Sequence, residues 1–157
     1  MNLPQPLRFI LPLLVLTVLP SCSGDFRKAW KEAPEPTFGF SADGCVLECV
    51  GKWEGTWHSE ATGHQGKLRC VVSYPVNQSD DREFFYHATW MGFLSGSYKA
   101  THSVQKKGDT YVFKGEHKMP DWAGGLYHYD GTIKANEFKA DYKSSADHGT
   151  YTMKRVR

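Results

Sequence analysis

The sequence has no long apolar run and no block of like charge. Its 157 residues carry 19 basic and 17 acidic side chains, for a net charge of +2, and these charges are dispersed along the chain. Dispersed, balanced charge leaves no electrostatic footprint for nucleic acid, so we expect no nucleic-acid partner. The longest apolar run, Phe9 to Leu19, is much shorter than the roughly twenty residues that a membrane-spanning helix needs.

The patterns that mark enzymes and metal sites are also missing. No Gly-x-Ser-x-Gly sequence, phosphate-binding loop or zinc-hydrolase pattern occurs. The seven histidines stand singly, without the His-x-x-x-His spacing that places two ligands on one helix face. We therefore predict no enzyme, no catalytic residues, no metal site and no required cofactor.

An export signal opens the chain. Arg8 precedes the apolar run and small residues follow it, which is the order of a secretory signal. The closing sequence Leu19-Pro20-Ser21-Cys22 resembles the lipobox of bacterial lipoproteins. The resemblance implies that residues 1–21 are a lipoprotein signal peptide and that Cys22 carries the lipid anchor.

The lipobox resemblance implies anchoring to the bacterial cell envelope. Ser23 rather than aspartate follows the cysteine, which favours the outer membrane if the host has one. The alternative is an ordinary secreted protein, cut nearby, for instance after Gly24. Residues 22–44 are polar and interrupted by Pro34 and Pro36, so we predict a lipidated tether or linker there.

From Gly51 onward, strand-like runs alternate with turn signals at intervals of about ten to fourteen residues, which is typical of an all-β sandwich or barrel. In each run the apolar residues alternate with polar ones, which predicts an antiparallel sheet with one buried face. Such a meander closes most economically into an up-and-down barrel, which also removes exposed sheet edges. We assign residues 45–157 to this domain, with strands at 52–59, 67–76, 83–93, 97–106, 110–118, 126–134, 137–143 and 149–155.

The first strand carries Gly51-x-Trp53-x-Gly55 and the last ends near Arg155. This arrangement resembles the calycin group, which includes lipocalins, avidins and the nitrobindin-type haem barrels. The resemblance implies that Arg155 packs over Trp53 and that the barrel holds a small ligand. Trp57 stands where the nitrobindin motif has its third glycine, so a haem-binding barrel is our third hypothesis.

Inward-facing aromatic and polar side chains are the candidates for a ligand site, because small-molecule pockets combine aromatic walls with a few placed polar groups. The loop from Met119 to Gly125 resembles a lid. Two of the histidines, His102 and His117, face the interior by alternation. The alternative to a ligand contact is that each is a hydrogen-bonded histidine of a packed core. The inward-facing tyrosines also allow two interpretations: their hydroxyls line a cavity, or they reach water at the barrel ends. The predicted ligand site comprises Trp53, Trp57, Tyr86, Trp90, His102, His117 and, in the lid, Trp122.

Three cysteines remain after Cys22, and disulfides persist in exported proteins. Since Cys70 has interior parity, we predict a bridge from Cys70 to Cys45 or Cys49. The alternative is a Cys-x-x-x-Cys redox or metal site assisted by His58 or His64.

The third predicted strand places apolar residues on its outer face, namely Phe85, Met91 and Phe93. We predict that the aromatic segment before Cys45 covers them.

The sequence as a whole supports two functional hypotheses. The first is an envelope lipoprotein whose barrel binds a small amphipathic or aromatic ligand. The second is a fully packed barrel that serves as an envelope interaction module and uses Phe85 and Phe93 to hold a partner protein.

Overall fold

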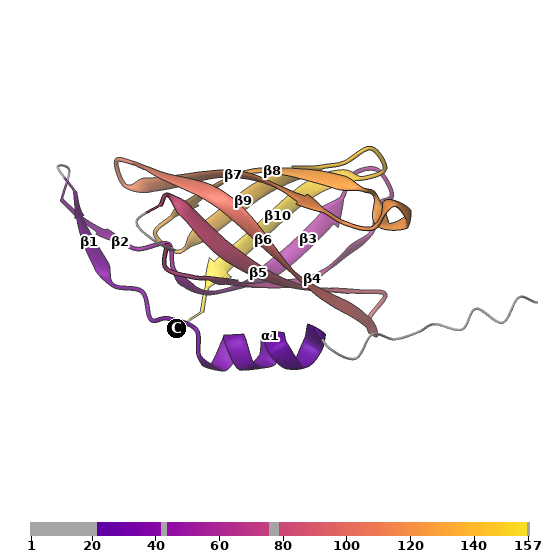
Figure 1. Ribbon diagram of the computed structural model, residues 1–157, viewed down its shortest axis with the longest axis horizontal. Helices are drawn as coiled ribbons and strands as arrows, with labels where there is room; N and C mark the ends of the chain where they lie inside the picture. Colours follow the sequence, from indigo (N-terminus) through magenta and orange to yellow (C-terminus); the bar gives the residue numbers. More distant parts are fainter. Residues whose placement is uncertain (1–21, 42–43, 76–78, 157) are drawn as a thin grey trace, which may run out of the picture.

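The computed structural model describes residues 22–41, 44–75 and 79–156 and shows one closed antiparallel barrel of eight strands (Figure 1). Each strand pairs with its neighbour in the sequence, and the last strand pairs with the first. The predicted up-and-down barrel is confirmed, and it is compatible with a calycin-like fold. The proposed signal peptide, residues 1–21, lies outside the described residues.

The elements follow the chain in a simple order. A helix and a short hairpin precede the barrel, and a single 3-10 turn interrupts it. They are α1 (Cys22–Lys31), β1 (Phe38–Ser41), β2 (Gly44–Leu47), β3 (Gly51–Ser59), β4 (Gln65–Val72), β5 (Asp81–Trp90), β6 (Leu94–Lys107), β7 (Thr110–Lys118), η1 (Asp121–Ala123), β8 (Leu126–Lys134), β9 (Glu137–Lys143) and β10 (His148–Arg155).

All eight predicted barrel strands exist, and β7, β8 and β9 have the predicted bounds. The strands β4 and β5 end earlier than predicted, at Val72 and Trp90. Apolar and aromatic residues continue past both ends, but Met91 has a positive φ of 53° and turns the chain out of the sheet. The helix α1 and the β1–β2 hairpin were not predicted.

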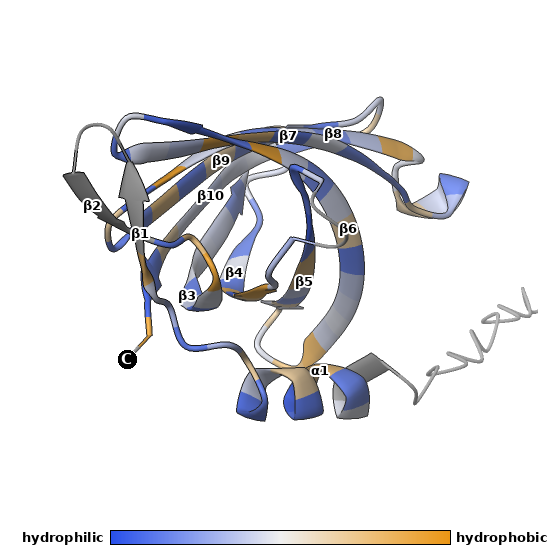
Figure 2. Ribbon diagram, turned by 60° about the vertical axis from the view of Figure 1, so that its left-hand side comes forward, coloured by the Kyte–Doolittle hydropathy of each residue, from blue (hydrophilic) through white to orange (hydrophobic). Residues whose placement is uncertain are grey.

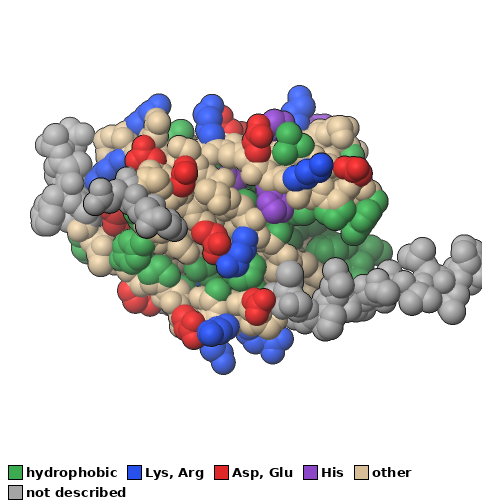
Figure 3. Space-filling view, in the orientation of Figure 1, with side chains coloured by type: hydrophobic (Ala, Val, Ile, Leu, Met, Phe, Trp, Pro, Cys, Tyr) green, Lys and Arg blue, Asp and Glu red, His purple; other side chains and the backbone are tan. Residues whose placement is uncertain are grey.

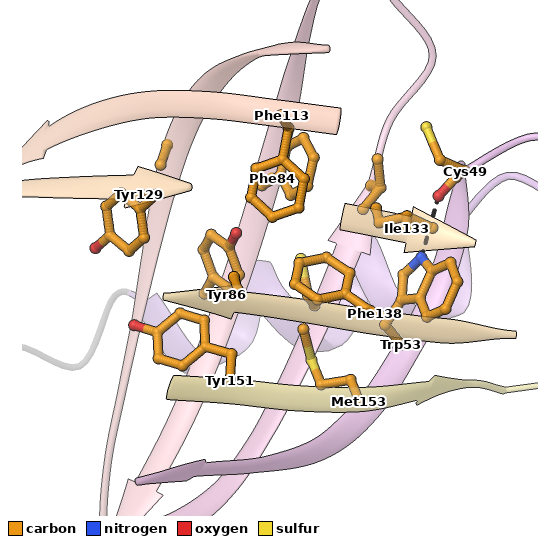
Figure 4. Packing of buried hydrophobic residues seen from close by; sticks show 14 of the residues in the cluster. Cys49, Trp53, Phe84, Tyr86, Phe113, Tyr129, Ile133, Phe138, Tyr151 and Met153 are labelled. Atoms are coloured by element: carbon orange, nitrogen blue, oxygen red, sulfur yellow. Dashed lines mark hydrogen bonds between the residues drawn. The ribbon is translucent and has the colours of Figure 1, made fainter. Parts of the chain in front are cut away.

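Aromatic rings from opposite walls meet inside the barrel (Figure 4). In the closed sheet, β5 lies opposite β9 and β6 lies opposite β10. The Phe84 and Phe138 rings lie 6.2 Å apart, and the Tyr86 and Tyr151 rings lie 5.8 Å apart. The Tyr98 and Tyr151 hydroxyl oxygens lie 3.0 Å apart. These contacts fill the barrel, in agreement with the narrow interior expected of eight strands.

Glycines on neighbouring strands make room for these rings. Gly115 pairs with His102 across β6 and β7, and Gly131 pairs with Phe113 across β7 and β8. A Cβ atom at Gly115 would collide with the His102 imidazole, and one at Gly131 would collide with the Phe113 ring. Both rings therefore depend on the absence of a side chain opposite them, the arrangement that allows an aromatic group to cover a strand glycine.

The barrel end where β3 begins and β10 ends is closed, and we call it the base. The Arg155 guanidinium lies 4.3 Å from the Trp53 ring centroid and donates 2.7 Å hydrogen bonds to the Val50 and Glu48 carbonyl oxygens. Trp53 donates from Nε1 to the Cys49 carbonyl oxygen at 3.1 Å. The expected packing of Arg155 over Trp53 is confirmed, and it ties the chain before β3 to the last strand.

The helix α1 lies outside the barrel wall, against β5 and β6 (Figures 1 and 2). Phe26 is buried against Phe85 and Val71, and its ring stacks on His87 at 4.9 Å. The predicted covering of Phe85 by the segment before Cys45 is therefore confirmed. For Met91 and Phe93 the prediction was wrong. Both belong to the β5–β6 turn rather than to the strand face and are exposed.

The predicted disulfide to Cys70 is not formed in the described part of the chain. Cys49 and Cys70 are both free and buried, and the side chain of Cys45 lies outside the described residues. Cys70 points into the barrel beside Tyr86, whereas Cys49 precedes β3 at the base. Burial raises the pKa of Cys49 to about 11, so its thiol stays protonated and is a poor redox or metal group.

Replacing Arg155 tests the closure of the base. We expect Arg155→Ala to lower the free energy of unfolding by about 3 kcal/mol, because it leaves two carbonyl oxygens without their donor and removes a cation–π contact. Urea unfolding measures the change. Lys154→Ala is the matched control, since Lys154 is adjacent and exposed. An equal loss in both variants would contradict this account of the base.

Candidate functional site

The end of the barrel opposite the base carries half-buried aromatic side chains, and we call it the mouth. The turns after β3, β5, β7 and β9 surround it. Inward-facing residues near these turns are only partly covered, unlike those deeper in the barrel. We refer to Trp57, Trp90, Tyr98, His117 and Tyr127 as the mouth aromatics.

Specific contacts hold four of the five mouth aromatics in place. Trp57 donates from Nε1 to the Thr89 carbonyl oxygen at 2.9 Å. The Tyr127 hydroxyl donates to the Ala123 carbonyl oxygen at 3.2 Å, and Tyr98 stacks on His117 at 5.1 Å. The rings therefore stand as fixed walls around the mouth.

A cluster of tyrosine hydroxyls forms the floor of the mouth. The Tyr98 oxygen lies 3.0 Å from that of Tyr151 and accepts a 3.2 Å hydrogen bond from Tyr129. Burial raises the pKa of Tyr129 to about 12 and those of Tyr98 and Tyr151 well above the ordinary value. The floor is therefore neutral at physiological pH, and its hydroxyls satisfy one another rather than an internal ligand.

One half of the rim is apolar. Met91 and Phe93 on the β5–β6 turn expose 67% and 78% of their surfaces. Trp122 on the β7–β8 connection exposes 89%, and Leu126, the first residue of β8, exposes 44%. We call these four residues the apolar half-rim. Figure 3 shows hydrophobic side chains gathered at this end of the molecule. The two connections follow one another around the barrel, so these apolar side chains lie on adjacent turns of the mouth.

The other half of the rim is polar and cross-linked. The Ser59 hydroxyl donates to Asp147 Oδ1 at 2.6 Å, and the Thr62 hydroxyl donates to Ser59 at 2.8 Å. Tyr142 donates to Asp147 Oδ2 at 3.4 Å. These bonds tie the β3–β4 turn to the β9–β10 turn, so the polar side of the mouth is a fixed frame.

The structure divides the predicted ligand residues between two places. Trp57, Trp90 and His117 are at the mouth, and Trp122 stands exposed on the rim. The remaining three, Trp53, Tyr86 and His102, are fully buried in the packed core below the floor. The predicted ligand site did not include Tyr98, Tyr127, Met91 or Leu126, although alternation of apolar and polar residues places the two tyrosines inside.

His102 packs as a core histidine. Its Nε2 atom and the Tyr86 hydroxyl lie 3.2 Å apart, and Nδ1 has no hydrogen-bond partner among the described residues. Burial, with a smaller contribution from His117, lowers the pKa of His102 to about 4. The imidazole is therefore neutral at physiological pH, as expected for a histidine enclosed by rings.

The charged outer face of the barrel is hollowed over β7 to β10. A shallow pocket of about 460 Å³ includes Lys114, Glu116, His128 and Asp130. Across the strands Lys114 pairs with Asp130 at 2.7 Å, and His128 with Glu116 at 2.9 Å. No group of three or more possible metal ligands occurs among residues 22–41, 44–75 and 79–156. The charged side chains of this face form ion pairs with one another.

Comparison of the chain with protein-family models, curated proteins and solved structures finds no match. Within the described residues, no helix is both long enough and apolar enough to cross a membrane.

The buried imidazole predicts a pH dependence of stability. An unfolded histidine has a pKa near 6.5, so between about pH 6.5 and pH 4 the unfolded chain binds a proton that folded His102 does not. The free energy of unfolding should therefore fall as the pH drops through this window, by up to roughly 3 kcal/mol.

Substitution of His102 separates its contribution to the pH dependence of stability from those of the other titratable groups. We expect His102→Asn to reduce the dependence of the free energy of unfolding on pH between pH 4 and pH 6.5, as followed by urea unfolding. A smaller dependence should persist, because burial also lowers the pKa of His87 and of His117. His128→Asn is the control because that side chain is more than half exposed. A wild-type slope in His102→Asn would show that this histidine does not carry the effect.

Proposed function

We propose that the protein is a lipid-anchored cell-envelope protein whose packed barrel is an interaction module, with the apolar half-rim as its contact surface. The observation that carries this proposal is the meeting of side chains from opposite walls, Phe84 with Phe138 and Tyr98 with Tyr151. Contacts across the barrel at these levels argue against a ligand deep inside it. We therefore place recognition at the surface.

The apolar half-rim is the surface best suited to recognition. Large exposed apolar side chains that gather in one place mark interaction sites more often than scattered ones do. Phe93 and Trp122 stand on turns rather than on a strand face, so folding of the barrel does not require them to be apolar. The packed barrel beneath holds both turns on a rigid support.

The anchor part of the proposal rests on the lipobox resemblance at Cys22. The helix α1 begins at Cys22, and α1 packs on the barrel through Phe26. An anchor at this residue leaves almost no free tether between lipid and barrel. The barrel is therefore held close to the membrane that carries it.

Lipidation and contact are tested together on the full chain expressed in a Gram-negative host. We expect incorporation of labelled palmitate and recovery with the membrane fraction, both lost in Cys22→Ser. A photo-cross-linking amino acid at position 93 should give a discrete adduct, whereas one at position 62 on the polar half-rim should not. A soluble, unlabelled product without rim adducts would refute the proposal.

A second candidate function is the binding of a small amphipathic or aromatic molecule at the mouth. The mouth aromatics favour it, since Trp57, Trp90 and His117 are half-buried walls above a neutral floor. Any such site is shallow. The structure does not favour haem binding below the floor, because His102 is enclosed there and its Nε2 atom lies 3.2 Å from the Tyr86 hydroxyl.

Native mass spectrometry of the gently purified chain tests the second candidate. A bound compound should appear as extra mass that is lost on denaturation and lost in Trp57→Ala. Trp53→Phe is the control, because Trp53 lies in the base rather than the mouth. A bare protein mass after exposure to a panel of amphipathic compounds would remove this function and leave the interaction module.

A further inference from the structure

We infer that the apolar half-rim docks on a lipid bilayer, so that the barrel stands mouth-down on the membrane that holds its anchor. This inference rests on the proposed function, since it names the partner of the same surface. It is carried by three observations, which concern the place where α1 begins, the shape of the half-rim and the charges around it.

The anchor and the half-rim lie at the same end of the barrel. The helix begins at Cys22 near the mouth and runs along the wall toward the base (Figure 1). Two contacts fix this direction. Phe26, early in α1, stacks on His87 in the mouth-side half of β5, whereas Glu35, after α1, accepts a 3.2 Å hydrogen bond from Tyr74 beyond the base end of β4. A lipid on Cys22 therefore brings the mouth, and not the base, to the membrane.

The half-rim has the shape of an inserting surface rather than a groove. Its side chains project from two separate turns and expose up to 89% of their surface, at Trp122. A protein partner needs a shaped complement of 1,200 Å² or more in a typical stable complex, whereas a fluid lipid surface accommodates isolated projecting side chains. Tryptophan in particular concentrates at the interface between lipid and water.

The connection that carries Trp122 is itself stiff. The Met119 amide donates to the Gly125 carbonyl oxygen at 2.8 Å, and the Ala123 amide donates to that of Pro120 at 2.8 Å. Trp122 sits on the 3-10 turn between them. The backbone that carries the indole is thus ordered before binding, which lowers the ordering cost of a small insertion.

Charges around the half-rim are balanced. On the β7–β8 connection Lys118, at its start, is offset by Asp121, and the β5–β6 turn of residues 91–93 carries no charge. The docking is therefore apolar, and we expect it to depend little on anionic lipid and little on salt. This expectation separates the inference from electrostatic adsorption.

The test uses the chain from residue 22 onward, which contains every element that the structure describes, with Cys22→Ser so that only the half-rim can bind. Vesicles of zwitterionic phosphatidylcholine are the probe. We expect the protein to sediment with the vesicles and brominated lipid to quench a part of the tryptophan fluorescence that Trp122→Phe removes. The double variant Met91→Ser with Phe93→Ser should weaken the partitioning by about tenfold.

Phe38→Ser is the matched control. Phe38 is equally large and 67% exposed but lies beyond the base, so its loss should not change partitioning. Thermal melting confirms that each variant folds. Sedimentation equal in the wild type and the double variant, or quenching that persists in Trp122→Phe, would overturn the inference.

Failure of the inference and failure of the proposed function give different results. If Cys22 is lipidated in cells and position 93 cross-links to a protein while the vesicles bind nothing, the interaction module stands and the bilayer is the wrong partner. If the vesicle experiment succeeds but labelled palmitate is not incorporated, the half-rim docks on lipid and the anchor is the part that fails.

Discussion

The narrow bore of an eight-stranded barrel is the constraint on which the rest of this structure depends. Such a barrel encloses little more than its own side chains, yet this one turns many aromatic rings inward. They fit because glycines stand opposite some of them, as Gly115 stands opposite His102 and Gly131 opposite Phe113. Each ring can then lie across the neighbouring strand instead of projecting into the centre. The result is a dense interior.

The two ends of the barrel are held together by different contacts. At the base, the Arg155 guanidinium joins the last strand to the residues before the first and covers Trp53. At the mouth, Asp147 accepts from Ser59 and Tyr142 and joins two turns on the polar side only. Within the part of the chain that the structure describes, the apolar side has no such link, and its turns carry Phe93 and Trp122 outward. The asymmetry of the mouth thus comes from its turns and not from its strands.

Much of the fold could be predicted from the sequence because alternation is a local property. Regular exchange of apolar and polar residues gives strand number and inward parity, and glycine-rich breaks give the turns. The site could not be predicted in the same way. Parity places Tyr98 and Tyr151 inside but does not say that their hydroxyls meet across the barrel. Whether an interior is hollow or filled depends on such non-local contacts.

The errors at Met91 and Phe93 have a local cause. Both continue the apolar pattern of β5, so alternation extends the strand through them. The positive φ of Met91 and of Gly92 ends it, and the two side chains pass from a sheet face to a rim. The helix α1 was missed for a related reason. Only Phe26 and Trp30, four residues apart, mark its buried face in an otherwise polar segment, which is a weak periodic signal.

Exposed apolar residues on a rigid frame call for a different explanation from those in a core. Phe84 and Phe138 stabilise the fold by packing, so their apolar character follows from stability. Phe93 and Trp122 contact solvent on turns where polar residues would serve the backbone equally well. Their exposure favours unwanted association. Their turns, β5–β6 and β7–β8, follow one another around the mouth, at the end of the barrel where α1 begins (Figure 1). A partner that meets the molecule from that end accounts for all of these features together, and packing accounts for none of them.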